Sequence, residues 1–181
     1  MKFTYTFLLV LVTVLFSACM DDKKKDTPEV KTMDTSPAKE VYNSAPIDAS
    51  FSDEQTATIF KNYIELKTAL VNTDSESVKA AAFDLMTAFA NKSVDDVLMK
   101  AAENIQNSDD IEVQRVQFVD VTAGVEALLA DAIQEGTVYK QYCPMAFNNT
   151  GAYWLSESKE IQNPYFGDKM LKCGRIDAEL K

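Results

Sequence analysis

Residues 52–91 read SDEQTATIFKNYIELKTALVNTDSESVKAAAFDLMTAFAN, and this stretch decides the fold of the chain. Apolar residues recur three or four positions apart in two successive runs, the spacing of one face of an α-helix. The two stripes consist of Ile59, Tyr63, Leu66 and Leu70, and then of Val78, Ala82, Leu85 and Phe89. The pattern predicts one helix over residues 53–72 and a second that closes near Asn91.

Capping residues mark where these two helices begin. Ser52 is followed three residues later by Gln55, the pattern of a capping box in which each side chain bonds the other residue's backbone. Asp74 and Ser75 offer the cap of the second helix, because short oxygen-bearing side chains accept hydrogen bonds from the first free amides.

Two further helices follow, and capping or helix-breaking residues again mark their ends. Ser93, with Asp96 three residues on, opens a shorter helix, and residues 107–110 then break the chain and cap a long fourth helix that Gly136 would end. Four amphipathic helices with short connections predict a mainly α fold, an antiparallel up-down four-helix bundle. Gly124 inside the fourth helix costs about 1 kcal/mol relative to alanine, so we expect either close helix packing there or simple tolerance.

The segment 137–181 differs from the helices in being rich in aromatic and turn residues. We expect it to form an irregular cap on a single helical domain that spans residues 51–181. Alternation over residues 139–143 and 152–155 allows two short strands, and hence a small β-hairpin within the cap.

The N-terminal sequence predicts an export signal. Lys2 precedes an uncharged, mostly apolar run, and the string Leu15-Phe16-Ser17-Ala18-Cys19 at its end resembles a bacterial lipoprotein signal. The resemblance implies that residues 1–18 are a signal peptide and that Cys19 is acylated. The alternative is an uncleaved anchor helix, which three lysines shortly after the run would favour.

Residues 19–50 contain few large apolar side chains and three of the five prolines, so they are expected to form a flexible tether. A lipid anchor would place the protein in the cell envelope of a Gram-negative bacterium, on the periplasmic or outer-membrane face. We expect the acyl chains on Cys19 to be the part of the protein that contacts the membrane.

The composition argues against two classes of function. The chain has 28 acidic and 18 basic residues and a net charge of -10, so DNA and RNA would be repelled. It has no histidine to serve as a general base, no glycine-rich phosphate loop and no evident facing pair of carboxylates. We therefore expect neither a nucleic-acid-binding protein nor an enzyme.

Four sulfur atoms near the C-terminus are the candidate site. Cys143 and Met145 form one pair, Met170 and Cys173 the other, and soft sulfur ligands favour Cu(I) and similar ions such as Ag(I). The alternative is a structural disulfide between Cys143 and Cys173 with the methionines merely packed nearby. Such a bond closes roughly 30 residues and would stabilise the fold by roughly 3 to 4 kcal/mol.

Three strings in the cap carry a resemblance to a known family. They are VYKQYCPMAF from Val138, GAYWLS from Gly151 and IQNPYFGDKMLKCG from Ile161. The chain from about Ser52 onward resembles a bacterial envelope domain family of unknown function, which occurs in small lipoproteins and appended to periplasmic adaptor subunits of heavy-metal and copper efflux systems.

The resemblance implies that Cys143, Met145, Met170 and Cys173 are metal ligands and that an efflux adaptor is a partner. Members of the family often carry histidines in the helical part, and their absence here leaves a sulfur-only Cu(I) or Ag(I) site. The sequence thus predicts a lipid-anchored protein of metal efflux or resistance. The alternative is a disulfide-stapled interaction module that holds no metal and docks on an envelope or efflux partner.

Overall fold

The computed structural model describes residues 41–181. The predicted signal peptide, the lipidated Cys19 and most of the predicted tether lie outside this range. Within residues 41–181, none of the helices has the length and apolar character needed to cross a bilayer.

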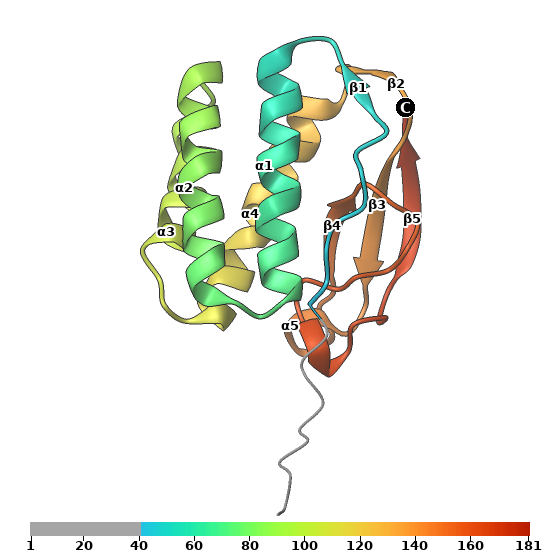
Figure 1. Ribbon diagram of the computed structural model, residues 1–181. Coiled ribbons are helices and arrows are strands. Elements are labelled where there is room, and N and C mark those ends of the chain that lie inside the picture. Colours follow the sequence, from blue (N-terminus) through green and yellow to red (C-terminus); the bar gives the residue numbers. More distant parts are fainter. Residues whose placement is uncertain (1–40) are drawn as a thin grey trace, which may run out of the picture. The chain divides into compact units, whose positions relative to one another are not determined.

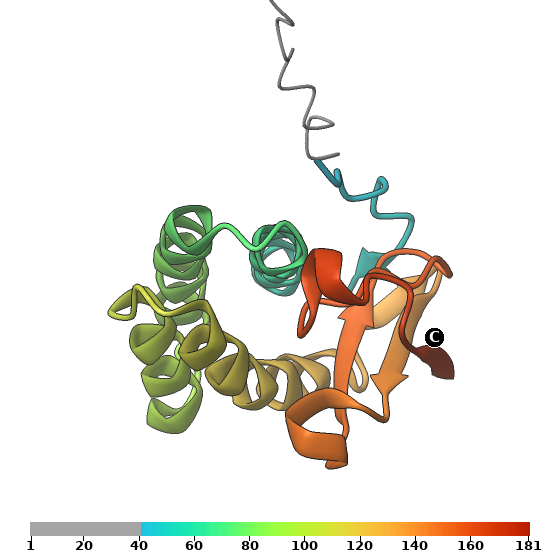
Figure 2. The ribbon, with the colours of Figure 1, turned by 90° about the horizontal axis from the view of Figure 1, so that it is seen from below.

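Helices make up the first half of the described chain, as expected for a mainly α fold. They are α1 (Glu54–Val71), α2 (Ser75–Lys92), α3 (Asp96–Gln106) and α4 (Ile111–Leu129), with a single short turn, α5 (Ala146–Asn149), further on. Each long helix contacts the next one along the chain, and α1 also contacts α4. Figures 1 and 2 show α1 and α4 between the sheet and the outer pair α2 and α3.

An aspartate caps each of the four long helices. Asp53, Asp74, Asp95 and Asp110 accept hydrogen bonds from backbone amides of the first turn, at 2.8 to 3.1 Å. The expected Ser52–Gln55 capping box is therefore wrong, and Gln55 instead donates to the carbonyl of Asn91. Ser93 was also misassigned, because it ends α2 with a left-handed backbone (φ 55°) rather than opening α3. Asp and Ser are comparable caps, so the sequence could not choose between neighbouring candidates.

The fourth helix is shorter than expected. It ends at Leu129, and residues 133–135 form strand β2, which pairs antiparallel with β1 (Ser50–Phe51). Gly136 lies in the turn after β2 with φ +81°, where a Cβ atom would come 2.3 Å from the carbonyl oxygen of Asp48. A glycine is needed there for a strand turn, not for a helix end.

Gly124 serves close helix packing. A Cβ atom at this position in α4 would lie 2.5 Å from a methyl carbon of Leu98 in α3. Of the two explanations considered for this glycine, the close approach of α3 and α4 is the one that the structure supports.

The C-terminal segment forms a three-stranded antiparallel sheet in the order β4-β3-β5. The strands are β3 (Val138–Cys143), β4 (Ala152–Ser156) and β5 (Arg175–Leu180). The hairpin of β3 and β4 confirms the two predicted strands, but the cap is more regular than expected because β5 was missed. The segment RIDAEL does alternate polar and apolar residues, but Asp, Ala and Glu are poor strand formers and most of its residues are exposed.

The sheet is joined to the helices through a buried aromatic and polar contact. Tyr63 of α1 lies between the rings of Phe60 and Phe118, and its hydroxyl bonds Thr122 of α4 at 2.9 Å. The same hydroxyl accepts a hydrogen bond from the backbone amide of Leu155 in β4 at 2.9 Å. One side chain thus links α1, α4 and the sheet.

A buried ion pair forms a second link. Lys67, one helical turn after Tyr63, contacts Glu157 at the end of β4 with a distance of 2.5 Å, and both side chains are fully buried. Glu157 also accepts hydrogen bonds from the hydroxyl of Tyr42 (3.0 Å) and the amide of Ala45 (3.1 Å). These contacts attach the last part of the predicted tether to the folded domain.

Burial and pairing act in opposite directions on the two charges. Burial lowers the pKa of Lys67, because desolvation disfavours the ammonium form. Burial alone would raise the pKa of Glu157, but the charge of Lys67 and its hydrogen bond outweigh it, and the pKa is lowered. Each ion therefore depends on the other.

Breaking this pair should destabilise the fold strongly. Glu157→Gln keeps an acceptor for Tyr42 but leaves the Lys67 ammonium without a counter-charge, and removal of one partner of a buried pair costs on the order of 3 to 5 kcal/mol. The double variant Lys67→Met, Glu157→Gln should recover most of that loss. Urea unfolding measures the stability of the single and the double variant. The control is Glu65→Gln, which removes the exposed Lys61–Glu65 pair and should leave the unfolding midpoint unchanged. A Glu157→Gln midpoint equal to that of Glu65→Gln would contradict the prediction.

Candidate functional site

The fold brings the two predicted thiol ligands into contact. Cys143 is the last residue of β3, and Cys173 lies two residues before β5, which pairs antiparallel with β3. The Sγ atoms are 3.3 Å apart and both cysteines are free thiols. Cys143 is fully buried, whereas Cys173 is partly exposed. The antiparallel register explains why residues 30 positions apart meet.

The distance between the thiols suits two kinds of chemistry. A disulfide has an S–S length of about 2.05 Å, and two thiolates at about 2.3 Å from one tetrahedral metal ion lie about 3.8 Å apart. A linear bis-thiolate requires a wider separation still. The observed 3.3 Å lies between the disulfide and the tetrahedral values. Each of these two states therefore requires side-chain shifts on the order of 1 Å or less, whereas a linear site requires larger shifts.

The backbone of Cys173 is held by an asparagine that the sequence analysis did not single out. Asn163 Nδ2 donates to the carbonyl of Cys173 at 2.6 Å, and its Oδ1 accepts from the amides of Tyr165 and Phe166. Arg115 of α4 is also buried and donates through Nε to the carbonyl of Pro164 at 2.9 Å. The helices therefore position the loop that carries Cys173. An asparagine before a proline suggests a turn, but nothing local points to Cys173.

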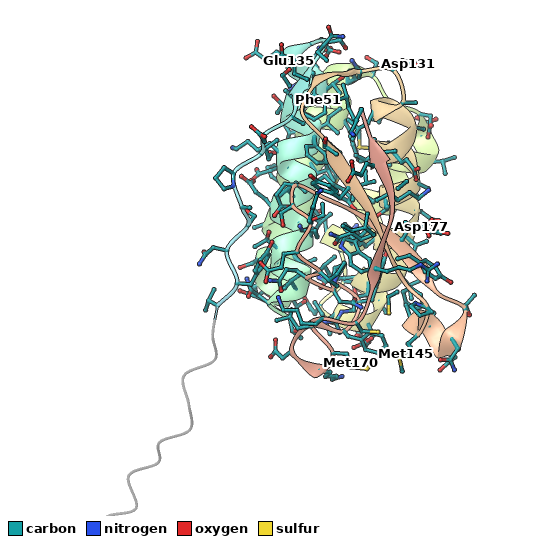
Figure 3. All side chains as sticks on the ribbon, turned by 90° about the vertical axis from the view of Figure 1, so that its right-hand side faces the viewer. Phe51, Asp131, Glu135, Met145, Met170 and Asp177 are labelled. Carbon is teal, nitrogen blue, oxygen red and sulfur yellow. The ribbon has the colours of Figure 1, made fainter. Side chains whose placement is uncertain are left out.

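The two methionines lie on a neighbouring hollow of about 630 Å³. Met145 is 46% exposed, and Met170 accepts a hydrogen bond through its carbonyl from the amide of Cys173 at 3.0 Å. The lining also includes Phe147, Tyr165 and Phe166, but neither cysteine. Figure 3 shows Met145 and Met170 at the same end of the molecule, away from Phe51 and Glu135. The structure thus pairs the thiols directly, whereas the two methionines line a hollow that includes neither thiol.

One wall of this hollow has an unusual backbone. Phe147, Asn148 and Asn149 have φ values of 50°, 57° and 68°, three successive residues in the left-handed region. Asparagine tolerates that region better than most residues, but a bulky residue such as phenylalanine rarely adopts it. Strained backbone of this kind is found preferentially at functional sites and ligand clamps. The Asn-Asn pair is the only sequence signal for this turn.

Two aromatic residues of the cap, Trp154 and Tyr165, are buried. Trp154 is fully buried and meets the ring of Tyr165 edge-on at 6.1 Å. Tyr165 in turn contacts Phe118 of α4 at 6.0 Å and Phe147 at 5.3 Å. Trp154 and Tyr165 therefore belong to the core that joins the sheet to α4.

The side chains that could bind a metal strongly are few. Across residues 41–181, no cluster of three or more cysteine, aspartate or glutamate side chains is arranged to hold a metal ion. Two thiolates would therefore be the main donors, and any third ligand would come from a thioether or from a partner molecule.

Comparison with known proteins identifies part of the helical region. Residues 59–136 match the sequence profile of a family described as a protein of unknown function, DUF3347. The matched stretch runs from within α1 to the turn after β2 and does not include the thiol pair. No curated protein and no solved structure matches the chain. The similarity is thus to a domain of unknown function, over the helices that support the site.

The contact between the thiols should be visible in their reactivity. The hydrogen bond with Cys143, together with partial burial, raises the pKa of the Cys173 thiol. Alkylation by iodoacetamide proceeds through the thiolate, so its pH midpoint at Cys173 should lie above that of free cysteine. In a Cys19→Ser background, Cys143→Ala should lower this midpoint, because the hydrogen bond is lost.

Cys143→Ser is the matched control, because a hydroxyl at the same place can still bond Cys173. Mass spectrometry of the alkylated peptide after reaction at a series of pH values measures the midpoint. Identical midpoints for the alanine variant and the native chain would show that the two thiols do not interact in solution.

Proposed function

We propose that this protein binds one soft metal ion, Cu(I) or Ag(I), through the reduced thiols of Cys143 and Cys173. The observation that carries the proposal is the 3.3 Å contact between two free thiols 30 residues apart in sequence. A thiolate at the end of β3 and another in the loop before β5 form a chelate whose backbone is already in place, so little ordering entropy remains to be lost on binding.

The choice of a soft ion rests on the donor set. Thiolate and thioether ligands select Cu(I) and similar ions, whereas Cu(II) sites lean on imidazole, and this chain has no histidine. Met145 and Met170 line the adjoining hollow, where a thioether can act as a third ligand or as an outer contact. Phe147, Tyr165 and Phe166 would limit access of water to that side.

We further propose that the protein acts at a membrane surface. Acylated Cys19 and the tether would hold the domain in the cell envelope, where a soft-metal site serves efflux or resistance. The helices, which we expect to form an antiparallel up-down bundle, would carry the site and offer a face to a periplasmic efflux adaptor. Catalysis is not part of the proposal.

A competitive Cu(I) titration tests the metal site. The chain with Cys19→Ser, purified in detergent and fully reduced, should hold one Cu(I) per molecule against a chromophoric chelator. The double variant Cys143→Ser, Cys173→Ser should bind no Cu(I), because both thiolate ligands have been removed. Failure of the reduced native chain to compete for Cu(I) would refute the proposal.

The methionines are tested by matched pairs of substitutions. Met145→Leu with Met170→Leu removes both thioethers and nearly preserves side-chain volume. If the thioethers are ligands, this double variant should bind Cu(I) on the order of tenfold more weakly. Met86→Leu with Met99→Leu is the control, since these residues pack against the core. Equal affinities for both double variants would restrict the site to the two cysteines.

The same contact supports a second candidate function. A disulfide between Cys143 and Cys173 would link the end of β3 covalently to the loop before β5. The domain would then be a rigid interaction module. Exposed Met145, Tyr153 and Ile176 would then be available to a partner in the envelope. Absence of Cu(I) binding by the reduced chain, together with stable folding of the oxidised one, would favour this candidate.

A further inference from the structure

The two thiols differ in their access to solvent. Cys143 is fully buried at the end of β3, whereas Cys173 is partly exposed in the loop before β5. They are nevertheless in contact at 3.3 Å. An external reagent can therefore reach one sulfur directly, and the other sulfur is in place to react next.

We propose that Cys143 and Cys173 form a reversible thiol–disulfide pair that closes and opens the metal site, with Cys173 as the attacking thiol and Cys143 as the resolving thiol. The reagent is a low-molecular-weight disulfide of the glutathione type. The gating part of this inference rests on the proposed metal-binding function, because closure removes both thiolate ligands.

The exchange proceeds in two balanced steps. The Cys173 thiolate attacks one sulfur of the external disulfide, a mixed disulfide forms at Cys173, and one small thiolate leaves and takes up a proton. The Cys143 thiolate then attacks Cys173 Sγ, the protein disulfide forms and the second small thiolate leaves. Two protein thiols are oxidised and one external disulfide is reduced to two thiols.

The surrounding structure keeps the two backbones in place during closure. Cys143 is paired in register with Ala152 of β4, and Cys173 is held through the Asn163 side chain and the Met170 carbonyl. Arg115 fixes the same loop through Pro164. Contraction from 3.3 Å to about 2.05 Å therefore needs side-chain motion and no break in the sheet.

The charges around Cys173 are balanced in pairs, so they do not repel an anionic disulfide. The residues on either side of the Cys173–Gly174 pair are Lys172 and Arg175, both exposed, although the chain as a whole carries a net charge of -10. Lys172 is paired with Glu160 and Arg175 with Asp177 at 3.3 Å, and the Arg175 guanidinium also lies 4.6 Å from the ring of Tyr142. A carboxylate-bearing disulfide such as glutathione disulfide would approach past these two cations.

The test uses the full-length Cys19→Ser chain in detergent micelles, in which Cys143 and Cys173 are the only cysteines. The reduced chain is mixed with glutathione disulfide, quenched with acid at intervals and weighed by mass spectrometry. We expect two thiols to be lost together, a transient single adduct, and full recovery of both thiols after treatment with a phosphine reductant.

Two single variants assign the order of attack. Cys143→Ala should accumulate a stable glutathione adduct at Cys173, whereas Cys173→Ala should react at Cys143 at least tenfold more slowly. Circular dichroism of both variants shows whether they are folded. If either is not, mapping the transient adduct in the native chain by peptide mass spectrometry assigns the attacking thiol. Equal adduct rates in two folded variants, or an adduct mapped to Cys143, would overturn the order of attack.

Copper retention separates the gating from the proposed function. The reduced chain should carry one Cu(I), and the oxidised chain should carry none until it is reduced again. A chain that holds Cu(I) when reduced and still holds it after complete oxidation would overturn the gating alone. A chain that forms the disulfide as described but never holds Cu(I) would overturn the proposed function and the gating with it.

Discussion

Two side chains on adjacent turns of α1 hold the sheet against the helices. The Tyr63 hydroxyl joins Thr122 of α4 to the backbone of Leu155 in β4, and Lys67 pairs with Glu157 where β4 ends. Both contacts are buried, so each polar group depends on its partner for the hydrogen bonds that water would otherwise supply. Because these contacts fix β4, they also fix β3, which carries Cys143.

The loop from residue 157 to residue 174 is positioned from both of its ends and from its middle. Glu157 anchors its start through Lys67, Arg115 of α4 binds the carbonyl of Pro164, and Asn163 binds that of Cys173. The only regular element in this loop is the short 3-10 helix Gly167–Lys169, and long loops with so little secondary structure are uncommon in compact domains. Here its ordered path brings Cys173 to Cys143, so the helices support the site without contributing a sulfur to the thiol pair.

The relation between the family match and the site follows from this arrangement. The match to a family of unknown function covers residues 59–136, which include Tyr63, Lys67 and Arg115. The matched part is therefore the scaffold that holds the sheet and the loop, while the thiols and thioethers lie beyond it. The two proposed uses of the thiol pair, soft-metal binding and disulfide formation, exclude each other, because a disulfide leaves no thiolate ligand.

The sequence by itself determined the helical class, the extent of most helices, the β3–β4 hairpin and the identity of the sulfur residues. Helical periodicity and strand alternation are local patterns, readable from neighbours in the chain. Local patterns did not determine the aspartate caps at Asp53 and Asp95, because competing cap residues lay one or two positions away. They also did not lead to the exposed strand Arg175–Leu180, whose alternation is carried partly by residues of low strand propensity. Only the tertiary structure decided that Lys67 and Glu157 are a buried pair, and that Cys143 and Cys173 touch while Met145 and Met170 line a separate hollow. The two contacts join residues 90 and 30 positions apart, and their geometry depends on how the helices and the sheet pack together.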